Sequence, residues 1–331
     1  MITKANTKKL RQGYSQDDKS ELCALADQTE NATPTKQLRV HGAMLISAFL
    51  VSTSFTVVKA ITPLWDPLLL TCCRFVLASA LFLALVRLRQ KISLPSLADF
   101  CRYSLISATL VLFFWLMFAA LRSTTPLNTA VIFTTVPGIS GIYSWLLLRE
   151  RLPGQGLIAL VLAMIGALWV LCDAKPSRLL ALQFSTGDLV FFSGCLLMAA
   201  YTPLVKYLYK GESMQVMTLW VLITGSFWLL LLSIPKIHLF LQIRSLPAEA
   251  ILGIIYLAVF TTIITFYLTQ WATLFLGPTR VAAYSFTYPA LILLLEWLLY
   301  GSIPSSATLL GIFFFFLPAM YVLQRRTSLA P

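Results

Sequence analysis

The sequence has few charged residues and lacks the patterns that most enzymes and nucleotide-driven machines require. Lys, Arg, Asp and Glu make up 11% of the 331 residues, and only His41 and His238 are histidines. The six cysteines show no metal-binding or disulfide spacing. There is no Gly-rich loop ending in Lys-Ser/Thr that would hold ATP, no paired carboxylates and no Ser/His arrangement. We therefore expect no metal, no cofactor and no enzymatic activity.

Apolar residues fill most of the chain instead. They make up 58% of the sequence, and the mean hydropathy is +0.82. A helix needs roughly 20 apolar residues to cross the hydrocarbon core of a membrane. The sequence predicts an all-α integral membrane protein with ten spans, at Gly42–Ile61, Pro67–Val86, Tyr103–Leu121, Leu127–Leu148, Gly154–Cys172, Leu189–Leu208, Met214–Ile234, Ile251–Leu274, Val281–Tyr300 and Ala307–Leu323.

The second half of the chain repeats the first. When residues 114–171 are laid over residues 266–323, a shift of 152 positions, 14 of the 58 positions are identical. Each repeat holds five predicted spans, and an odd number inverts the second repeat relative to the first, as in many secondary transporters. The most informative matches are Pro126 with Pro278, Thr135 with Thr287, Pro137 with Pro289, and Trp145 with Trp297.

Basic residues predict the orientation of the spans. Eleven Lys and Arg residues flank the predicted inner ends and five flank the outer ends, which places both termini in the cytoplasm. This rule accounts for much of the net charge of +12, so we expect contact with membrane lipid and no nucleic-acid binding. The predicted order is a disordered cytoplasmic tail at 1–41, repeats at 42–172 and 187–323, and a short cytoplasmic tail at 324–331.

The segment 128–153, NTAVIFTTVPGISGIYSWLLLRERLP, resembles the signature of the EamA family in the drug/metabolite transporter superfamily. Pro137, Glu150 and Arg151 stand at the family's mid-membrane proline and inner Glu-Arg positions, whereas the second half keeps Pro289 but has Ser302 at the acidic position. The run CCRFVLASALFL also resembles the family's second helix. The resemblance implies ten helices, inverted repeats and movement of small organic solutes across an inner or plasma membrane.

Three charged residues fall inside the predicted spans, where each costs about 2.5–3.5 kcal/mol at mid-helix by insertion scales. Lys59 lies near the outer end of the first span, and Arg74 lies about 12 Å inward from the outer end of the second. Glu296 lies about 6 Å inward in the ninth span. We expect these residues to serve coupling or charge recognition. The alternatives are that Lys59 snorkels to the interface, that Arg74 satisfies backbone carbonyls, and that Glu296 is structural.

Two further groups of residues are candidates for substrate binding. Pro137 and Pro289 each remove a backbone hydrogen bond inside a span, and interruptions at equivalent repeat positions indicate a midplane site. Hydroxyl groups lie beside them, with the alternative that these only repair the kinks. The second group is aromatic and polar, and suits a planar or amphipathic solute. The predicted binding residues are Trp115, Thr135, Pro137, Tyr201, Tyr267, Gln270, Tyr284, Ser285 and Pro289.

These observations predict a secondary transporter for small amino-acid-like or amphipathic metabolites, working in export by alternating access. Uptake or exchange of a larger anionic metabolite, such as a nucleotide-type solute, is the alternative, although only Arg74 is a deep cation. A channel, a structural assembly factor and an intramembrane enzyme are the other classes to weigh. A homodimer stays open as an assembly state.

Overall fold

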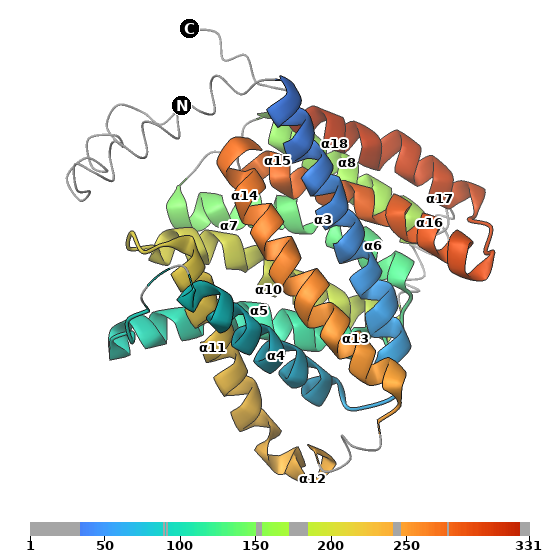
Figure 1. The fold of residues 1–331 in the computed structure, drawn as a ribbon. Helices are drawn as coiled ribbons and strands as arrows, with labels where there is room; N and C mark the ends of the chain where they lie inside the picture. The colour runs from blue at the N-terminus through green and yellow to red at the C-terminus, as the bar shows by residue number, and fades with distance from the viewer. Residues whose placement is uncertain are drawn as a thin grey trace, which may run out of the picture.

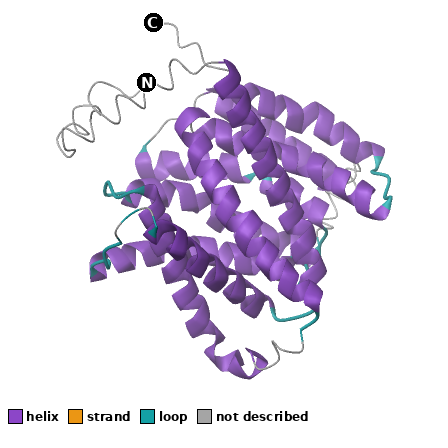
Figure 2. Cartoon of the chain, in the orientation of Figure 1, coloured by secondary structure: helices purple, strands orange, loops and turns teal. Residues whose placement is uncertain are grey.

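The structure, a computed structural model, describes residues 34–88, 90, 92–149, 154–171, 185–240, 246–276 and 278–324. Every regular element in these ranges is helical (Figures 1 and 2). The first repeat contains α3 (Pro34–Ile61), α4 (Pro67–Arg87), α5 (Leu97–Ala120), α6 (Pro126–Phe133), α7 (Val136–Leu148) and α8 (Gly154–Leu171). The second contains α10 (Thr186–Leu208), α11 (Met214–Ser233), η1 (Ile234–Lys236), α12 (Ile237–Phe240), α13 (Ala248–Ala258), η3 (Val259–Ile264), α14 (Thr265–Leu276), α15 (Pro278–Ala282), η4 (Ala283–Thr287), α16 (Tyr288–Tyr300), α17 (Ser306–Gly311), η5 (Ile312–Phe316) and α18 (Leu317–Gln324).

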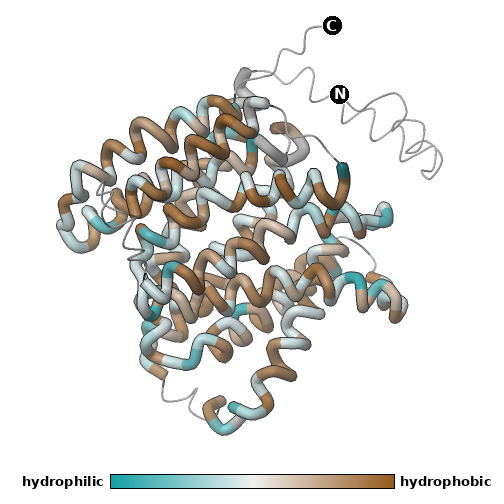
Figure 3. The backbone as a smooth tube through the Cα atoms, turned by 180° about the vertical axis from the view of Figure 1, so that it is seen from behind, coloured by the Kyte–Doolittle hydropathy of each residue, from teal (hydrophilic) through white to brown (hydrophobic). Residues whose placement is uncertain are grey.

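These elements correspond to the ten predicted spans. In the described part of the chain, nine helical segments are long and apolar enough to cross a membrane, and a shorter apolar helix, Gly156–Leu171, stands where the fifth span was expected. The chain is thus an all-α membrane protein of ten helices in two five-helix repeats. Large apolar side chains such as Leu298 and Phe313 stay more than half exposed, which suits contact with lipid, and the tube in Figure 3 is correspondingly rich in apolar residues.

Polar residues decide where several helices begin. The Asp66 carboxylate accepts the Leu68 N–H, and Pro67 is the first residue of α4. Ser96 similarly caps α5, which therefore begins at Leu97 and not at Tyr103. The described part of the first helix runs from Pro34 to Ile61, so it includes residues 34–41, which the sequence analysis assigned to the tail. The tail segments 1–33 and 325–331 lie outside the described residues.

The packing of the helices repeats when the two halves are exchanged. Helix α5 of the first half packs on α10 of the second, and the counterpart pair, α14 of the second half and α3 of the first, also packs. The pair α10 with α7 has its counterpart in α3 with α16, and α11 with α5 has its counterpart in α4 with α13. Two further pairs map onto themselves: α4 with α11, and α8 with α18. In Figure 1, α3 and α14 lie side by side across the front, and α8 and α18 lie together to one side.

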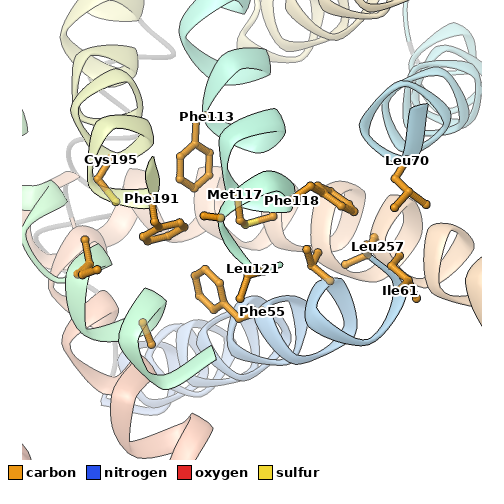
Figure 4. Packing of buried hydrophobic residues seen from close by; sticks show 14 of the residues in the cluster. Phe55, Ile61, Leu70, Phe113, Met117, Phe118, Leu121, Phe191, Cys195 and Leu257 are labelled. Atoms are coloured by element: carbon orange, nitrogen blue, oxygen red, sulfur yellow. The ribbon is translucent and has the colours of Figure 1, made fainter. Parts of the chain in front are cut away.

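An aromatic cluster fills the centre, where four helices meet. Phe55 of α3 is 1% exposed, and its ring centroid lies 6.0 Å from that of Phe191 and 6.1 Å from that of Phe133. Tyr288 of α16 packs on Phe133 at 5.7 Å. Figure 4 shows Phe55, Phe191 and Phe113 converging from three different helices. The cluster therefore joins α3, α6, α10 and α16, which belong to both repeats.

The close approach of α10 to the end of α5 gives a first prediction. A Cβ atom on Gly187 would lie 2.7 Å from the Ala120 carbonyl oxygen and 2.7 Å from Ser123 Oγ. Gly187→Ala should therefore destabilise the protein by about 1–3 kcal/mol, because a backbone carbonyl cannot move aside cheaply. Thermal unfolding of purified protein in detergent measures this. Gly42→Ala is the control, because a Cβ there meets nothing within 4 Å. Equal melting temperatures for the two variants would show that α10 and α5 are less tightly packed than the structure has them.

Candidate functional site

Both repeats interrupt a helix at the same place. In the first half α6 ends at Phe133 and α7 begins at Val136, one residue before Pro137. In the second half the segment η4 tightens into a 3-10 helix just before Tyr288 and Pro289. Proline has no backbone N–H and removes a hydrogen bond inside each span. The predicted breaks at the two aligned prolines are thus present as changes in helix type.

Threonine hydroxyls form the same hydrogen bond at both interruptions. Thr135 Oγ1 donates to the Ile132 carbonyl oxygen at 2.7 Å, and Thr287 Oγ1 donates to the Tyr284 carbonyl oxygen at 2.7 Å. The two bonds are related by the repeat shift of 152 residues. This geometry favours the alternative that these hydroxyls stabilise the kinks. The Thr135 hydroxyl is used in this bond, so a solute would be recognised here by the backbone around the proline.

The second interruption is more enclosed than the first. Tyr284, Ser285 and Pro289 are all buried, whereas Thr135 and Pro137 are partly buried. The Tyr284 hydroxyl forms a hydrogen bond with His41 Nδ1 on α3, which joins this interruption to the N-terminal part of the first span. Ser285 Oγ is buried and forms no hydrogen bond. A hydroxyl without a partner inside the membrane is a point at which a polar ligand group can bind.

The predicted aromatic residues separate into two groups. Trp115 of α5 and Tyr201 of α10 are both partly buried and pack on the same apolar cluster between α4, α5 and α11. Tyr267 of α14 is 53% exposed, so it is not enclosed with them. The side chain of Gln270 lies outside the described part of the structure, as do Glu150 and Arg151. Trp115 and Tyr201 thus pack against the same buried cluster, whereas Tyr267 is exposed.

The three intramembrane charges have different surroundings. Lys59 Nζ donates to the Thr124 carbonyl oxygen at 2.8 Å, so it binds the end of the loop after α5. Arg74 is 1% exposed and donates to the hydroxyls of Thr261 and Thr262. Glu296 is partly buried on α16, and among the described side chains no ion pair joins it to Lys59 or Arg74. The three residues do not form one ion-pair network in this conformation.

A buried carboxylate that the sequence analysis missed lies at the predicted outer end. Asp188 of α10 is 6% exposed and accepts hydrogen bonds from the Thr124 hydroxyl and from Asn128 Nδ2 at 3.2 Å. It also accepts the Ser185 N–H at 3.0 Å, which completes a capping box. Because Lys59 binds the carbonyl of the same Thr124, this junction connects α3, α5, α6 and α10. The Ser-x-x-Asp spacing at 185–188 was the available sequence signal.

Charged clusters also join helix ends elsewhere. Arg102 of α5 pairs with Glu212 at 2.9 Å and Asp99 at 3.2 Å, and Lys210 pairs with Asp99 at 2.9 Å. At the opposite end of the bundle Lys236 pairs with Asp66 at 2.7 Å. These pairs lie at the helix termini, where water is available. They connect neighbouring spans and leave the middle of the bundle to the neutral polar groups and Arg74.

Two five-helix repeats with interrupted helices are the architecture of many membrane transporters. A model of the EamA-like transporter family matches residues 39–172 and residues 185–324. The chain belongs to this family, which is part of the drug/metabolite transporter superfamily. The resemblance inferred from the motif at 128–153 is thereby confirmed.

Two Bacillus subtilis (strain 168) proteins are similar to the chain, and both are named as uncharacterized transporters. YdfC is 23% identical over 285 residues, which cover 84% of this chain and 88% of that protein. YyaM is 23% identical over 201 residues, which cover 60% of this chain and 66% of that protein, slightly less than two thirds of its length. A solved protein structure matches with a TM-score of 0.60 at 18% identity, over 87% of this chain and 99% of that one, and supports the fold alone.

The junction at Asp188 gives the second prediction. Asp188→Ala should lower the melting temperature of the purified protein, because each buried donor left without an acceptor costs roughly 1–3 kcal/mol. Asp188→Asn should have a smaller effect, since an amide keeps one acceptor oxygen. Ser193→Ala on the same helix is the control, because its hydroxyl is exposed and bonds only to the Leu189 carbonyl. A melting temperature for Asp188→Ala equal to that of the control would show that the junction does not stabilise the bundle.

Proposed function

We propose that the chain is a secondary transporter that exports small amino-acid-like or amphipathic metabolites by alternating access. The observation that carries this proposal is the pair of interrupted helices at Pro137 and Pro289, which carry the same threonine bond. Interruptions at equivalent positions of two repeats mark the substrate site in many transporters. Because α6 packs on α16, the two interruptions lie on spans that contact each other near the centre of the bundle.

An inverted arrangement of the repeats supports alternating access. Each repeat contributes five spans, so equivalent helices run in opposite directions across the membrane. Several contacting helix pairs, such as α5 with α10 and α3 with α14, recur when the halves are exchanged, which supports a pseudo-twofold relation between them. Two conformations can then arise by exchanging the shapes of the two repeats, with the site open first to one side and then to the other. This is the behaviour of a transporter and not of a fixed pore.

The location and orientation of the chain follow from its charges. We place it in the inner or plasma membrane as a multi-pass protein with both termini in the cytoplasm, because eleven basic residues flank the inner ends and five the outer ends. Under this orientation the Asp188 junction and the Lys236–Asp66 pair lie outside, and the Arg102 cluster lies inside. Substrates and lipid are the partners that this arrangement needs.

The energy for transport comes from a gradient, and Glu296 is the residue that we assign to proton coupling. It lies partly buried in α16, in the span that carries Pro289, and the first repeat has Ser144 at the equivalent position. A carboxyl group in this position can take up a proton when it faces one side and release it when it faces the other. Exchange of solutes without protons is the alternative source of energy.

Uptake or exchange of a larger anionic metabolite is the second candidate function. A nucleotide-type solute carries several negative charges and calls for several cations in the binding region. Among the described residues inside the spans, Arg74 is the one deeply buried cation, since Lys59 binds a loop carbonyl and Arg102 pairs with carboxylates at a helix end. A single deeply buried cation among the described residues favours a smaller solute.

Flux from proteoliposomes tests the function and gives the third prediction. Vesicles loaded with a cellular metabolite extract should release a small set of solutes only when the protein is present, as read by mass spectrometry of the external solution. A pH gradient should change the rate in the wild type and not in Glu296→Gln, because glutamine has a similar shape but does not titrate. Glu249→Gln, at an exposed position at the start of α13, is the control and should respond like the wild type.

Two results would contradict the proposal at different levels. If the wild type released no solute above protein-free vesicles under any gradient, the chain would not be a transporter of small metabolites. If Glu296→Gln kept the full response to the pH gradient, transport would stand and proton coupling through Glu296 would fall.

A further inference from the structure

Arg74 is the largest side chain that is almost completely buried in the described part of the chain. It lies in α4 with 1% of its surface exposed. A guanidinium group stays protonated in proteins, so this position carries a full positive charge inside the membrane. Such a charge is expensive there and is almost always paired or used in function. Its contacts should therefore show which of the two applies.

Every described contact of the guanidinium is neutral. Nε and Nη2 donate to Thr262 Oγ1 at 3.2 and 3.1 Å, and Nη2 donates to Thr261 Oγ1 at 3.2 Å. The guanidinium carbon lies 4.2 Å from the ring centroid of Phe114. Hydroxyl dipoles and an aromatic face stabilise a cation only in part. No acidic side chain among the described residues forms an ion pair with Arg74.

One edge of the guanidinium has no partner. Nη1 is buried and forms no hydrogen bond. Removing such a donor from water without a bond costs free energy, more for a charged group than for a neutral one. A purely structural arginine would be expected to use these N–H groups on nearby carbonyls. The unbonded N–H groups of Nη1 can instead donate hydrogen bonds to an anion.

The surroundings of Arg74 connect it with the predicted substrate region. Phe114, the ring under the guanidinium, is only partly buried and belongs to the same cluster as Trp115 and Tyr201. Thr261 and Thr262 lie in η3, where the helix widens to a π-helix between α13 and α14. π-Bulges inside α-helices frequently occur at functional sites, and they allow local rearrangement. Movement of η3 away from α4 would expose the guanidinium beside the partly buried rings of Phe114, Trp115 and Tyr201.

We propose that Arg74 binds the carboxylate of the transported solute through Nη1, with the apolar part of the solute against Phe114, Trp115 and Tyr201. This inference rests on the proposed transport function and adds the substrate class: a solute with one carboxylate and an apolar or aromatic body. The carboxylate supplies the counter-charge that the protein does not, and an arginine fork matches its two oxygens. The hydroxyls of Thr261 and Thr262 hold the guanidinium in place when no solute is bound.

A binding measurement on the purified full-length chain tests this proposal without requiring transport, and it is the fourth prediction. The probes are 3-phenylpropionate and its primary amide, 3-phenylpropionamide, which differ only in the anionic group. The acid should raise the melting temperature of the wild type in a saturable manner, and the amide should raise it much less. In Arg74→Gln the apparent affinity for the acid should fall by about tenfold or more, because a charge-assisted bond is lost.

Two further variants keep the result interpretable. Arg74→Lys retains the charge without the fork, so it should bind the acid more weakly than the wild type but still prefer it to the amide. Arg122→Gln is the matched control, because Arg122 is exposed and donates only to the carbonyls of Thr62 and Trp65. It should keep the acid preference of the wild type. If Arg74→Gln does not fold, the wild type, Arg74→Lys and Arg122→Gln decide the matter.

The proposal is overturned if the wild type binds acid and amide equally, or binds neither. It is also overturned if folded Arg74→Gln keeps the acid preference, since Arg74 would then be structural. These outcomes leave the transport function standing if vesicles containing the wild type still release solutes. Conversely, acid-selective binding without any release would keep the anion site and remove the transporter.

Discussion

The satisfaction of backbone hydrogen bonds inside the membrane is the constraint on which the rest of this structure depends. Lipid offers no partner for a free carbonyl or N–H, so a proline in a span must be accompanied by a local repair. Both repeats have the same local arrangement: a threonine hydroxyl two residues before the proline donates to the carbonyl three residues behind it. At the first interruption the Ile132 carbonyl also accepts the Thr135 N–H at 3.0 Å, so the hydroxyl adds a second bond to the tightened turn.

The two interruptions determine what can surround them. Phe133, directly before the first, and Tyr288, directly after the tightened turn of the second, pack together and on Phe55. These rings fill the centre of the bundle, and the ion pairs and the buried carboxylate lie at its two ends. The Asp188 junction ties one end, and the Arg102 cluster ties the other. Arg74 is the exception, a charge held between η3 and Phe114.

Much of this arrangement could be predicted from the sequence, because hydrophobic length and proline act locally. The spans and the paired breaks at Pro137 and Pro289 follow from such signals. The π-helix at η3 could not be predicted in this way, because residues 259–264 (VFTTII) contain no proline or glycine to mark it, and the partner of Thr261 and Thr262 is Arg74 of another helix. Asp188 was missed because it stands at a helix start and is buried by the loop at Thr124, a contact between residues distant in sequence. The exposure of Tyr267 could not be predicted either, because it depends on how α14 is rotated about its axis in the bundle.

Distances across the membrane test the central claim, that two repeats joined at interrupted helices exchange their shapes. Pairs of spin labels at the ends of the first spans of the two repeats would report both sides of the membrane, because all four positions are exposed. Leu64, in the turn after α3, pairs with Leu189 of α10 at the predicted outer side, and Leu38 of α3 pairs with Tyr207 of α10 at the predicted inner side. In proteoliposomes, pulsed electron paramagnetic resonance should show two distance populations at each end. Conditions that lengthen the outer distance should shorten the inner one. A single fixed distance at both ends, or lengthening of both together, would contradict alternating access.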